Sequence, residues 1–260
     1  MNASFETGEK RLTRMALVRK RFARNKLAVA GLVILVAMFV LAFVGPFFGK
    51  HSWDSLDFFS LLQPPSKEHF FGTSQIGGDV YALTLRGLQK SLIIGILVAI
   101  FSTGLAAIAG GFAGFYGGKV DRSVMWIIDA LLVLPSFLII AVMSPWFRGR
   151  TWLIFVVLLA AFGWMITARI VRSATMSLRE RDFVRAAIYM GIPARKIVFR
   201  HLLPNVASIL IIDATLNVGG TILSETGLSY LGFGVQPPDV SLGSLIAEGT
   251  ASALTYPWLF

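Results

Sequence analysis

Five long apolar segments separated by polar stretches dominate the hydropathy pattern of this chain. They lie at residues 27–48, 92–116, 124–147, 152–171 and 206–223. An apolar run of about 20 residues can cross a bilayer as a helix. We therefore expect an all-α, polytopic membrane protein with five visible transmembrane helices. The third should be kinked at Pro135, because the proline ring removes a backbone hydrogen bond.

The two ends of the pattern need separate interpretation. Segment 27–48 is too long for the apolar region of a signal peptide, and no small-residue cleavage site follows it, so we interpret it as an uncleaved first span. The tail from residue 227 onward is rich in glycine and proline and is broken at Pro237-Pro238. It contains no clean sixth span.

Composition supports a membrane protein and excludes several chemistries. Hydrophobic residues make up 55% of the chain and charged residues 15%, against about 45–50% and about 25% in soluble domains. The absence of cysteine excludes disulfides, thiolate metal sites and cysteine nucleophiles. The histidines, at positions 51, 69 and 201, are far apart along the chain, so we expect no multi-histidine metal centre.

Basic residues set the expected orientation, because they collect on the cytoplasmic side of a membrane. Segments 1–26 and 169–205 each hold eight lysines and arginines against two acidic residues, whereas 49–91 is balanced. We therefore expect a basic cytoplasmic N-terminus (1–26), able to lie as an amphipathic helix on the inner leaflet, and a membrane domain over 27–260. Its external loop is 49–91. Arg148 and Arg150 would lie on the external side, contrary to this rule, but two charges do not outweigh two clusters of eight.

The cytoplasmic loop at 172–205 has the pattern of two helices joined by a turn. Helical propensity runs from Arg179 to Met190; Gly191 suits a left-handed helix end, and Pro193 suits the first turn of a second helix. Such an element outside the membrane predicts a docking site for a partner. The alternative is a basic loop that lies on anionic lipid headgroups.

The same loop carries a resemblance to a known family. Residues 184–191, with the ending Phe199-Arg200-His201-Leu202-Leu203-Pro204-Asn205, resemble the EAA loop of ABC-importer permeases of the oligopeptide/dipeptide/nickel branch. The resemblance implies a coupling helix that sits in a groove of an ATPase subunit. The coupling residues would be Ala186, Ala187, Gly191, Ile192, Pro193, Arg195 and Arg200. Arg185 stands where the family usually has a glutamate, so the contact of that glutamate does not carry over.

Further stretches extend the resemblance over most of the chain. Residues 71–79 are similar to the family's outer-loop pattern, although Ser74 and Gly78 replace its aspartate and arginine. Residues 114–121, 129–135 and 225–238 match later motifs, with Trp126 where an arginine is common. The "C" permeases of dipeptide importers are the most similar in appearance. The family places a sixth span after a segment matching Pro257-Trp258-Leu259, so we expect that the sequence is shortened there or that this span is absent.

Small residues and acidic residues within the spans give two further sets of candidates. Small residues four apart predict a close helix contact, within the subunit or with a partner, or simple helical-core packing: Ala106, Gly110, Gly114 and Gly118. Charge in a membrane is costly and usually faces protein or water. The acidic residues therefore either line a translocation pathway or are structural hydrogen-bonded carboxyls: Asp129, Asp213 and Glu225.

Absent motifs complete the functional expectation. The chain has no phosphate-binding Gly-x-x-x-x-Gly-Lys-Ser/Thr loop, no nucleophile elbow and no HExxH. We therefore expect a transport subunit without enzymatic activity, without a cofactor or metal of its own, in the bacterial cytoplasmic (inner) membrane. The resemblance implies a second permease, two ATPase subunits that bind ATP and Mg, and an extracytoplasmic binding protein. Nucleic acid is not an expected partner, because the positive-inside rule already explains the charge.

The expected mechanism is alternating access driven by the ATPases. The cargo stays open among dipeptides, longer peptides, nickel chelates and haem. One alternative is an ion-coupled secondary transporter, in which Asp129, Asp213 and Glu225 form a proton or cation relay. A second alternative is a membrane scaffold whose basic loop recruits a cytoplasmic partner, although a scaffold has no use for acidic residues in its spans.

Overall fold

The computed structural model describes residues 20, 22–147 and 152–260. The chain divides into two units, residues 1–48 and 49–260, which are described separately. Regular elements of the described residues are all helical, with two isolated β-bridges in the loop before the second long helix. The prediction of an all-α chain is confirmed. Most of the basic N-terminus, together with Arg148 and Arg150, lies outside the described residues.

Among its described residues, the first unit contains one candidate membrane span, α2 (Lys26–Val44), which continues into the short helix η1 (Gly45–Phe48). The Asn25 side chain accepts a hydrogen bond from the backbone N–H of Ala28 at 3.2 Å and caps its start. Apolar side chains cover α2 on all sides and are mostly exposed within this unit. A helix that is apolar all round is suited to lipid or to burial among other membrane helices.

The second unit is built around α3 (Val80–Tyr116), a 37-residue helix capped by the Asp79 side chain. It begins twelve residues before the apolar run that predicted it, so the preceding loop covers 49–79 and not 49–91. Hydropathy misses the first three turns because Arg86 and Lys90 interrupt the apolar pattern. At about 1.5 Å per residue the helix is about 55 Å long, well beyond the about 30 Å hydrocarbon core.

Two of the predicted spans are pairs of helices joined at a bend. Helices α4 (Gly118–Val133) and α5 (Ser136–Met143) meet at Leu134-Pro135 with a bend of 72°, at the predicted kink. Helices α6 (Leu153–Gly163) and α7 (Met165–Arg179) are bent by 45° at Trp164. The second bend was not predicted, since no proline marks it; Gly163 precedes it.

The remaining elements follow α7 in order. Helix α8 (Asp182–Tyr189) is followed by α9 (Ala194–Ile197), the π-turn η3 (Val198–Leu202) and α10 (Leu203–Tyr230). The last three form one continuous helix from Ala194 to Tyr230, and Pro193 is its N-cap, one residue before the predicted first turn. The chain then forms α11 (Leu242–Ser252) and η4 (Pro257–Leu259).

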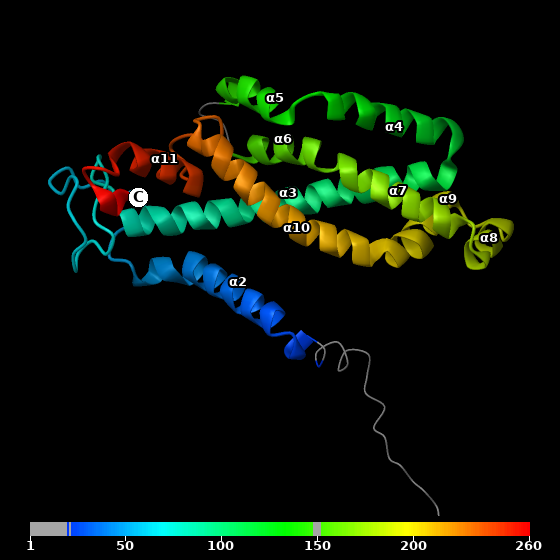
Figure 1. The fold of residues 1–260 in the computed structure, drawn as a ribbon, viewed down its shortest axis with the longest axis horizontal. Helices are drawn as coiled ribbons and strands as arrows, with labels where there is room; N and C mark the ends of the chain where they lie inside the picture. The colour runs from blue at the N-terminus through cyan, green and yellow to red at the C-terminus, as the bar shows by residue number, and fades with distance from the viewer. Residues whose placement is uncertain (1–19, 21, 148–151) are drawn as a thin grey trace, which may run out of the picture. The chain divides into compact units, whose positions relative to one another are not determined.

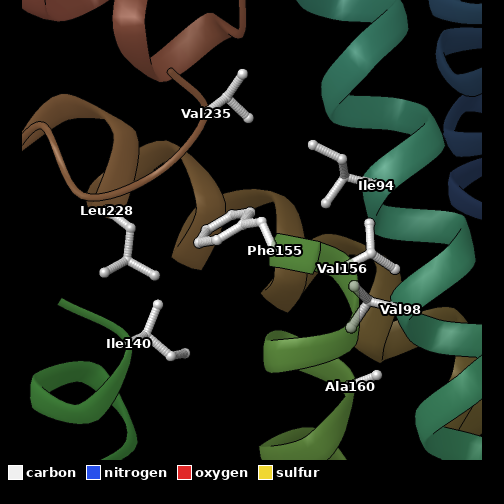
Figure 2. Packing of buried hydrophobic residues seen from close by; sticks show 8 residues of the cluster. All are labelled: Ile94, Val98, Ile140, Phe155, Val156, Ala160, Leu228 and Val235. Carbon is white, nitrogen blue, oxygen red and sulfur yellow. The ribbon is translucent and has the colours of Figure 1, made fainter. Parts of the chain in front are cut away.

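Counting each bent pair once, the described residues contain five candidate spans, as predicted. Helix α3 packs most extensively on α7 and α10 (Figure 1). Figure 2 shows a buried apolar cluster to which α3, α5, α6 and α10 all contribute; its members are Ile94, Val98, Ile140, Phe155, Val156, Ala160, Leu228 and Val235. Through this cluster, α5 of the first bent pair and α6 of the second pack against the long helices α3 and α10.

The small residues of α3 let α7 approach closely. Ala106 is fully buried, and a Cβ atom at Gly110 would lie 2.9 Å from Val171 Cβ. A Cβ atom at Gly114 would lie 2.8 Å from Thr175 Cβ. Gly118 was wrongly included in this row. It lies beyond the end of α3, begins α4 and is exposed with open space around it, because the chain turns at Gly117.

Candidate functional site

The α8–α9 turn is held by a buried apolar cluster. Val184 and Ala187 on α8 pack with Ile197, Val198 and Leu202 of the next helix and with Phe115 near the end of α3. All six side chains are at most 8% exposed. The turn is therefore packed against the body of the second unit, which distinguishes it from a loop that only rests on a surface.

Gly191 closes α8 in a Schellman motif. Its φ is +72°, in the left-handed region that the sequence predicted. Its N–H donates to the Ile188 carbonyl at 2.9 Å, and the Ile192 N–H donates to the Ala187 carbonyl at 3.1 Å. Ile192 then packs against the buried cluster. The glycine thus fixes the direction in which the chain enters α9.

Most of the exposed side chains on α8 are apolar, and Asp182 and Arg185 share that surface. Tyr189 is 88% exposed and Met190 is 71% exposed, and three further apolar side chains around the turn are exposed: Phe183, Ile188 and Phe199. A rigidly held apolar patch of this kind is typical of a protein contact. Tyr189 and Met190 were not among the predicted coupling residues, although the period of α8 places them away from Val184 and Ala187.

The predicted coupling residues divide into two groups. Ala186, Gly191, Pro193, Arg195 and Arg200 are exposed and accessible to a partner. Ala187 is buried and Ile192 is half-buried, so these two residues support the turn from inside. The sequence pattern alone does not separate these groups.

The residue that departs from the family pattern forms a local ion pair. Arg185 contacts the Glu180 carboxylate. The hydrogen bond and the charge of Arg185 lower the pKa of Glu180, and the same interactions raise the pKa of Arg185. Both side chains are more than half exposed, so the pair contributes little to stability. The negative charge of Glu180 offsets the positive charge of Arg185 beside the apolar patch.

The three predicted intramembrane acids do not gather at one place. Asp129 of α4 pairs with Arg169 of α7, and both side chains are largely exposed. Asp213 of α10 accepts hydrogen bonds from three side chains: Thr103 at 3.1 Å, Thr167 at 2.6 Å and Asn217 at 2.9 Å. Asp213 and Glu225 are twelve residues apart on one helix, about 18 Å.

Glu225 secures the turn after α10. Its side chain is fully buried and accepts hydrogen bonds from Ser91 at 2.9 Å and Ser229 at 2.6 Å. The Ser229 hydroxyl also accepts from the Val235 N–H at 3.0 Å. Nearby, buried Lys90 pairs with Asp239 at 2.7 Å. These bonds hold the segment that follows α10 against α3.

A cavity of about 490 Å³ lies between α3, α5, α6 and α10. Apolar side chains line it together with uncharged polar ones: Ser102, Ser136, Asn217, Thr221 and Ser224. None of the three predicted acids lines it. The polar residues were missed because serine, threonine and asparagine are ordinary within membrane helices and gave no signal along the sequence.

The structure of the 49–79 loop corrects the expectation that the histidines lie far from one another. The rings of His51 and His69 stack with centroids 4.5 Å apart, so distance along the sequence was misleading for these two histidines. His69 Nδ1 lies 2.8 Å from Asp79 Oδ2. At the two positions that depart from the family's outer-loop pattern, the Ser74 hydroxyl accepts a hydrogen bond from the Gly78 N–H at 3.0 Å.

Comparison with known proteins accounts for this architecture. The family described as binding-protein-dependent transport system inner membrane component matches residues 92–259, and the N-terminal transmembrane domain of oligopeptide transport permease C matches residues 13–65. The chain belongs to this transport-system family. It is a permease subunit and not an enzyme.

Individual relatives resemble the permease over almost its whole length. It is 56% identical to the oligopeptide transport system permease protein OppC of Mycobacterium tuberculosis (strain ATCC 25618 / H37Rv), over 95% of the chain and 86% of the relative. It is 37% identical to OppC of Haemophilus influenzae, over 93% and 78%. It is 36% identical to the dipeptide transport system permease protein DppC of Bacillus subtilis, over 92% and 74%.

Proposed function

We propose that this permease imports peptides as one half of the membrane pathway of an ATP-driven transporter. The observation that carries the proposal is the α8–α9 turn, with a mostly apolar outer surface on a buried support. When a partner displaces this surface, the rest of the permease moves with it, because the turn is packed on the buried cluster and does not move independently. The similar oligopeptide and dipeptide permeases favour peptides as the cargo.

The docked partners are two ATPase subunits, which bind ATP and Mg themselves. One contacts Tyr189, Met190 and the exposed coupling residues of this chain, and the other contacts the second permease. An extracytoplasmic binding protein delivers the peptide on the opposite side of the membrane. ATP and the loaded binding protein each drive the cycle only by favouring one conformation over another.

The cavity between α3, α5, α6 and α10 is our candidate for part of the peptide pathway. Its uncharged hydroxyl and amide groups can exchange hydrogen bonds with the peptide backbone, which every peptide shares. A wall without fixed charge does not select among peptide side chains by charge. We therefore assign the pathway role to this cavity in preference to Asp129, Asp213 and Glu225.

The ion-coupled alternative is not favoured, because the three acids that it requires are separately paired or hydrogen-bonded. A proton relay needs groups within hydrogen-bond reach or linked by water. Uptake that collapses with the proton gradient and survives ATP depletion would restore that alternative.

The orientation in this proposal follows from the positive-inside rule, and the choice of the inner membrane rests on the matching family, which is described as an inner membrane component. The permease lies in the bacterial inner membrane with its N-terminus and the α8–α9 turn in the cytoplasm. The 49–79 loop and the segment after α10 then lie on the outer face.

Gly191 provides the sharpest test of ATPase docking. At φ +72° a β-branched residue is strained, whereas asparagine tolerates this conformation. We expect Gly191→Val to retain membrane insertion but to lose most ATPase co-purification from mild detergent and most peptide uptake. Gly191→Asn should keep both.

The experiment requires co-expression with the second permease and the ATPase chains. Tyr189→Ser provides a variant without backbone strain and should weaken ATPase recovery while the second permease still co-purifies. Wild-type uptake by both Gly191→Val and Tyr189→Ser would contradict the docking assignment. ATPase recovery with no peptide uptake by the wild-type complex would contradict the cargo and leave the docking site standing.

A further inference from the structure

Three potential metal ligands meet at the edge of the 49–79 loop. His51, His69 and Asp79 each offer one ligand atom, and these atoms all lie within 4.8 Å of one another. His69 and Asp79 are buried. The three residues come from the start of the loop, its return and the N-cap of α3, so the cluster exists only in the folded chain.

Hydrogen bonding within the loop leaves one nitrogen of the cluster unsatisfied. Asp79 accepts the Ala82 N–H at 2.8 Å with one carboxylate oxygen and contacts His69 Nδ1 with the other. His51 Nε2, by contrast, is shielded from solvent and has no hydrogen-bond partner among the described residues. A buried polar atom without a partner is costly and requires an explanation. A bound metal ion would give this nitrogen a partner.

The surrounding charge favours a cation. Two further carboxylates, those of Asp57 and Glu68, belong to the same loop, and Glu68 is the chain neighbour of His69. The Lys50 ammonium is paired with Glu68 at 3.1 Å, and residues 49–79 hold four acidic residues against two lysines. The loop that carries the two histidines therefore has a net negative charge.

We infer that His51, His69 and Asp79 form a binding site for a divalent cation of the zinc type. Two imidazole nitrogens and one carboxylate are ligands that Zn²⁺ commonly takes, with water able to complete the site. Ligand atoms about 2.0–2.2 Å from a tetrahedral zinc lie about 3.4 Å apart. The most separated ligand atoms must therefore approach by up to about 1.4 Å, whereas His69 Nδ1 and Asp79 Oδ2, which are 2.8 Å apart, must separate if both bind the ion.

The ion would fasten the loop to the start of α3. The loop is already ordered by backbone bonds, including Asp57 N–H to the Gly77 carbonyl at 3.1 Å and Val80 N–H to the Gly72 carbonyl at 3.1 Å. Metal binding to a preformed site adds its free energy to the folded state. The chain has no cysteine, so no disulfide can serve the same purpose.

The test uses the full chain in detergent, purified without a polyhistidine tag and stripped with a chelator. Zn²⁺ binding is measured by competition with a chromogenic chelator and by metal analysis after dialysis. We expect one zinc per chain and an apparent melting temperature that rises with zinc. His51→Gln should raise the Kd at least about tenfold. His201→Gln, a histidine on η3 outside the cluster, should leave it unchanged.

Several results would overturn the inference. These are the absence of stoichiometric zinc on the wild-type chain, wild-type affinity in both His51→Gln and His69→Gln, or an equal loss in His201→Gln. His51→Gln removes a nitrogen that has no partner, so it should preserve folding, which helical circular dichroism and a monodisperse elution profile check. Asp79→Asn retains a capping oxygen for α3 while removing the charge, and it should also weaken zinc binding.

Discussion

At the scale of single residues, two glycines of α3 have opposite surroundings. A Cβ atom at Gly110 would lie 2.9 Å from Val171 Cβ and 3.0 Å from the Arg172 backbone nitrogen, whereas one at Gly104 would meet nothing within 4 Å. Both lie inside the same helix. The comparison therefore separates close packing from helix propensity.

We expect Gly110→Ala to destabilise the permease by about 1–3 kcal/mol, because the added methyl group forces α7 away from α3. Gly104→Ala should be neutral or stabilising by up to about 1 kcal/mol, since alanine is the better helix former. Apparent melting temperatures in one detergent measure both. Equal shifts in the two variants would show that α3 and α7 are not closely packed at Gly110.

Sequence patterns located some of these residues and misplaced others for physical reasons. Ala106, Gly110 and Gly114 follow one another at intervals of four residues. This interval is a property of a single helix, so the sequence alone reveals it. Gly118 continues the spacing but lies beyond a helix end that spacing does not reveal. His51 and His69 meet only because the loop folds back on itself, which no local pattern encodes.

At the scale of elements, the turn after α10 depends on one hydroxyl group. Ser229 donates to Glu225 and accepts from the Val235 N–H, and it is 4% exposed. Ser229→Ala would leave a buried carboxylate oxygen and a backbone N–H without these bonds. An unmade buried hydrogen bond costs about 1–3 kcal/mol.

We therefore expect Ser229→Ala to lower the apparent melting temperature and to expose residues 231–241 to protease. Ser224→Ala, at an exposed position on the same helix, is the matched control and should change neither. Unchanged protease resistance in Ser229→Ala would mean that the Lys90–Asp239 pair and the backbone hydrogen bonds of the turn suffice to hold it.

Element boundaries were harder to predict than the elements. Apolar runs identified all five spans, because lipid-crossing length and apolar composition are local properties. They missed the first three turns of α3, where Arg86 stacks on Trp53 and Lys90 pairs with Asp239, contacts that keep polar residues in a helix. They also missed the bend at Trp164, since only proline was expected to produce one.

At the scale of the whole molecule, the lack of cysteine makes the orientation directly measurable. Single cysteines replace Phe59, 97% exposed in the 49–79 loop, and Tyr189, 88% exposed on α8. The proposed orientation predicts that a membrane-impermeant maleimide labels Phe59→Cys in cells whose outer barrier has been removed. Tyr189→Cys should react only after permeabilisation. The reverse pattern would show the opposite orientation. Labelling of both cysteines from one side would show that the number of membrane crossings between these two residues differs from the proposed one.

The unbroken length of α3 has a mechanical consequence. Its first residue adjoins Asp79 in the His51–His69 cluster, and near its last turn Phe115 joins the cluster beneath α8. The 49–79 loop and the α8–α9 turn therefore pack at opposite ends of one continuous helix. In the proposed orientation, a binding event that tilts one end of α3 as a rigid body also displaces the other end, so this helix couples the outer and cytoplasmic faces of the permease mechanically.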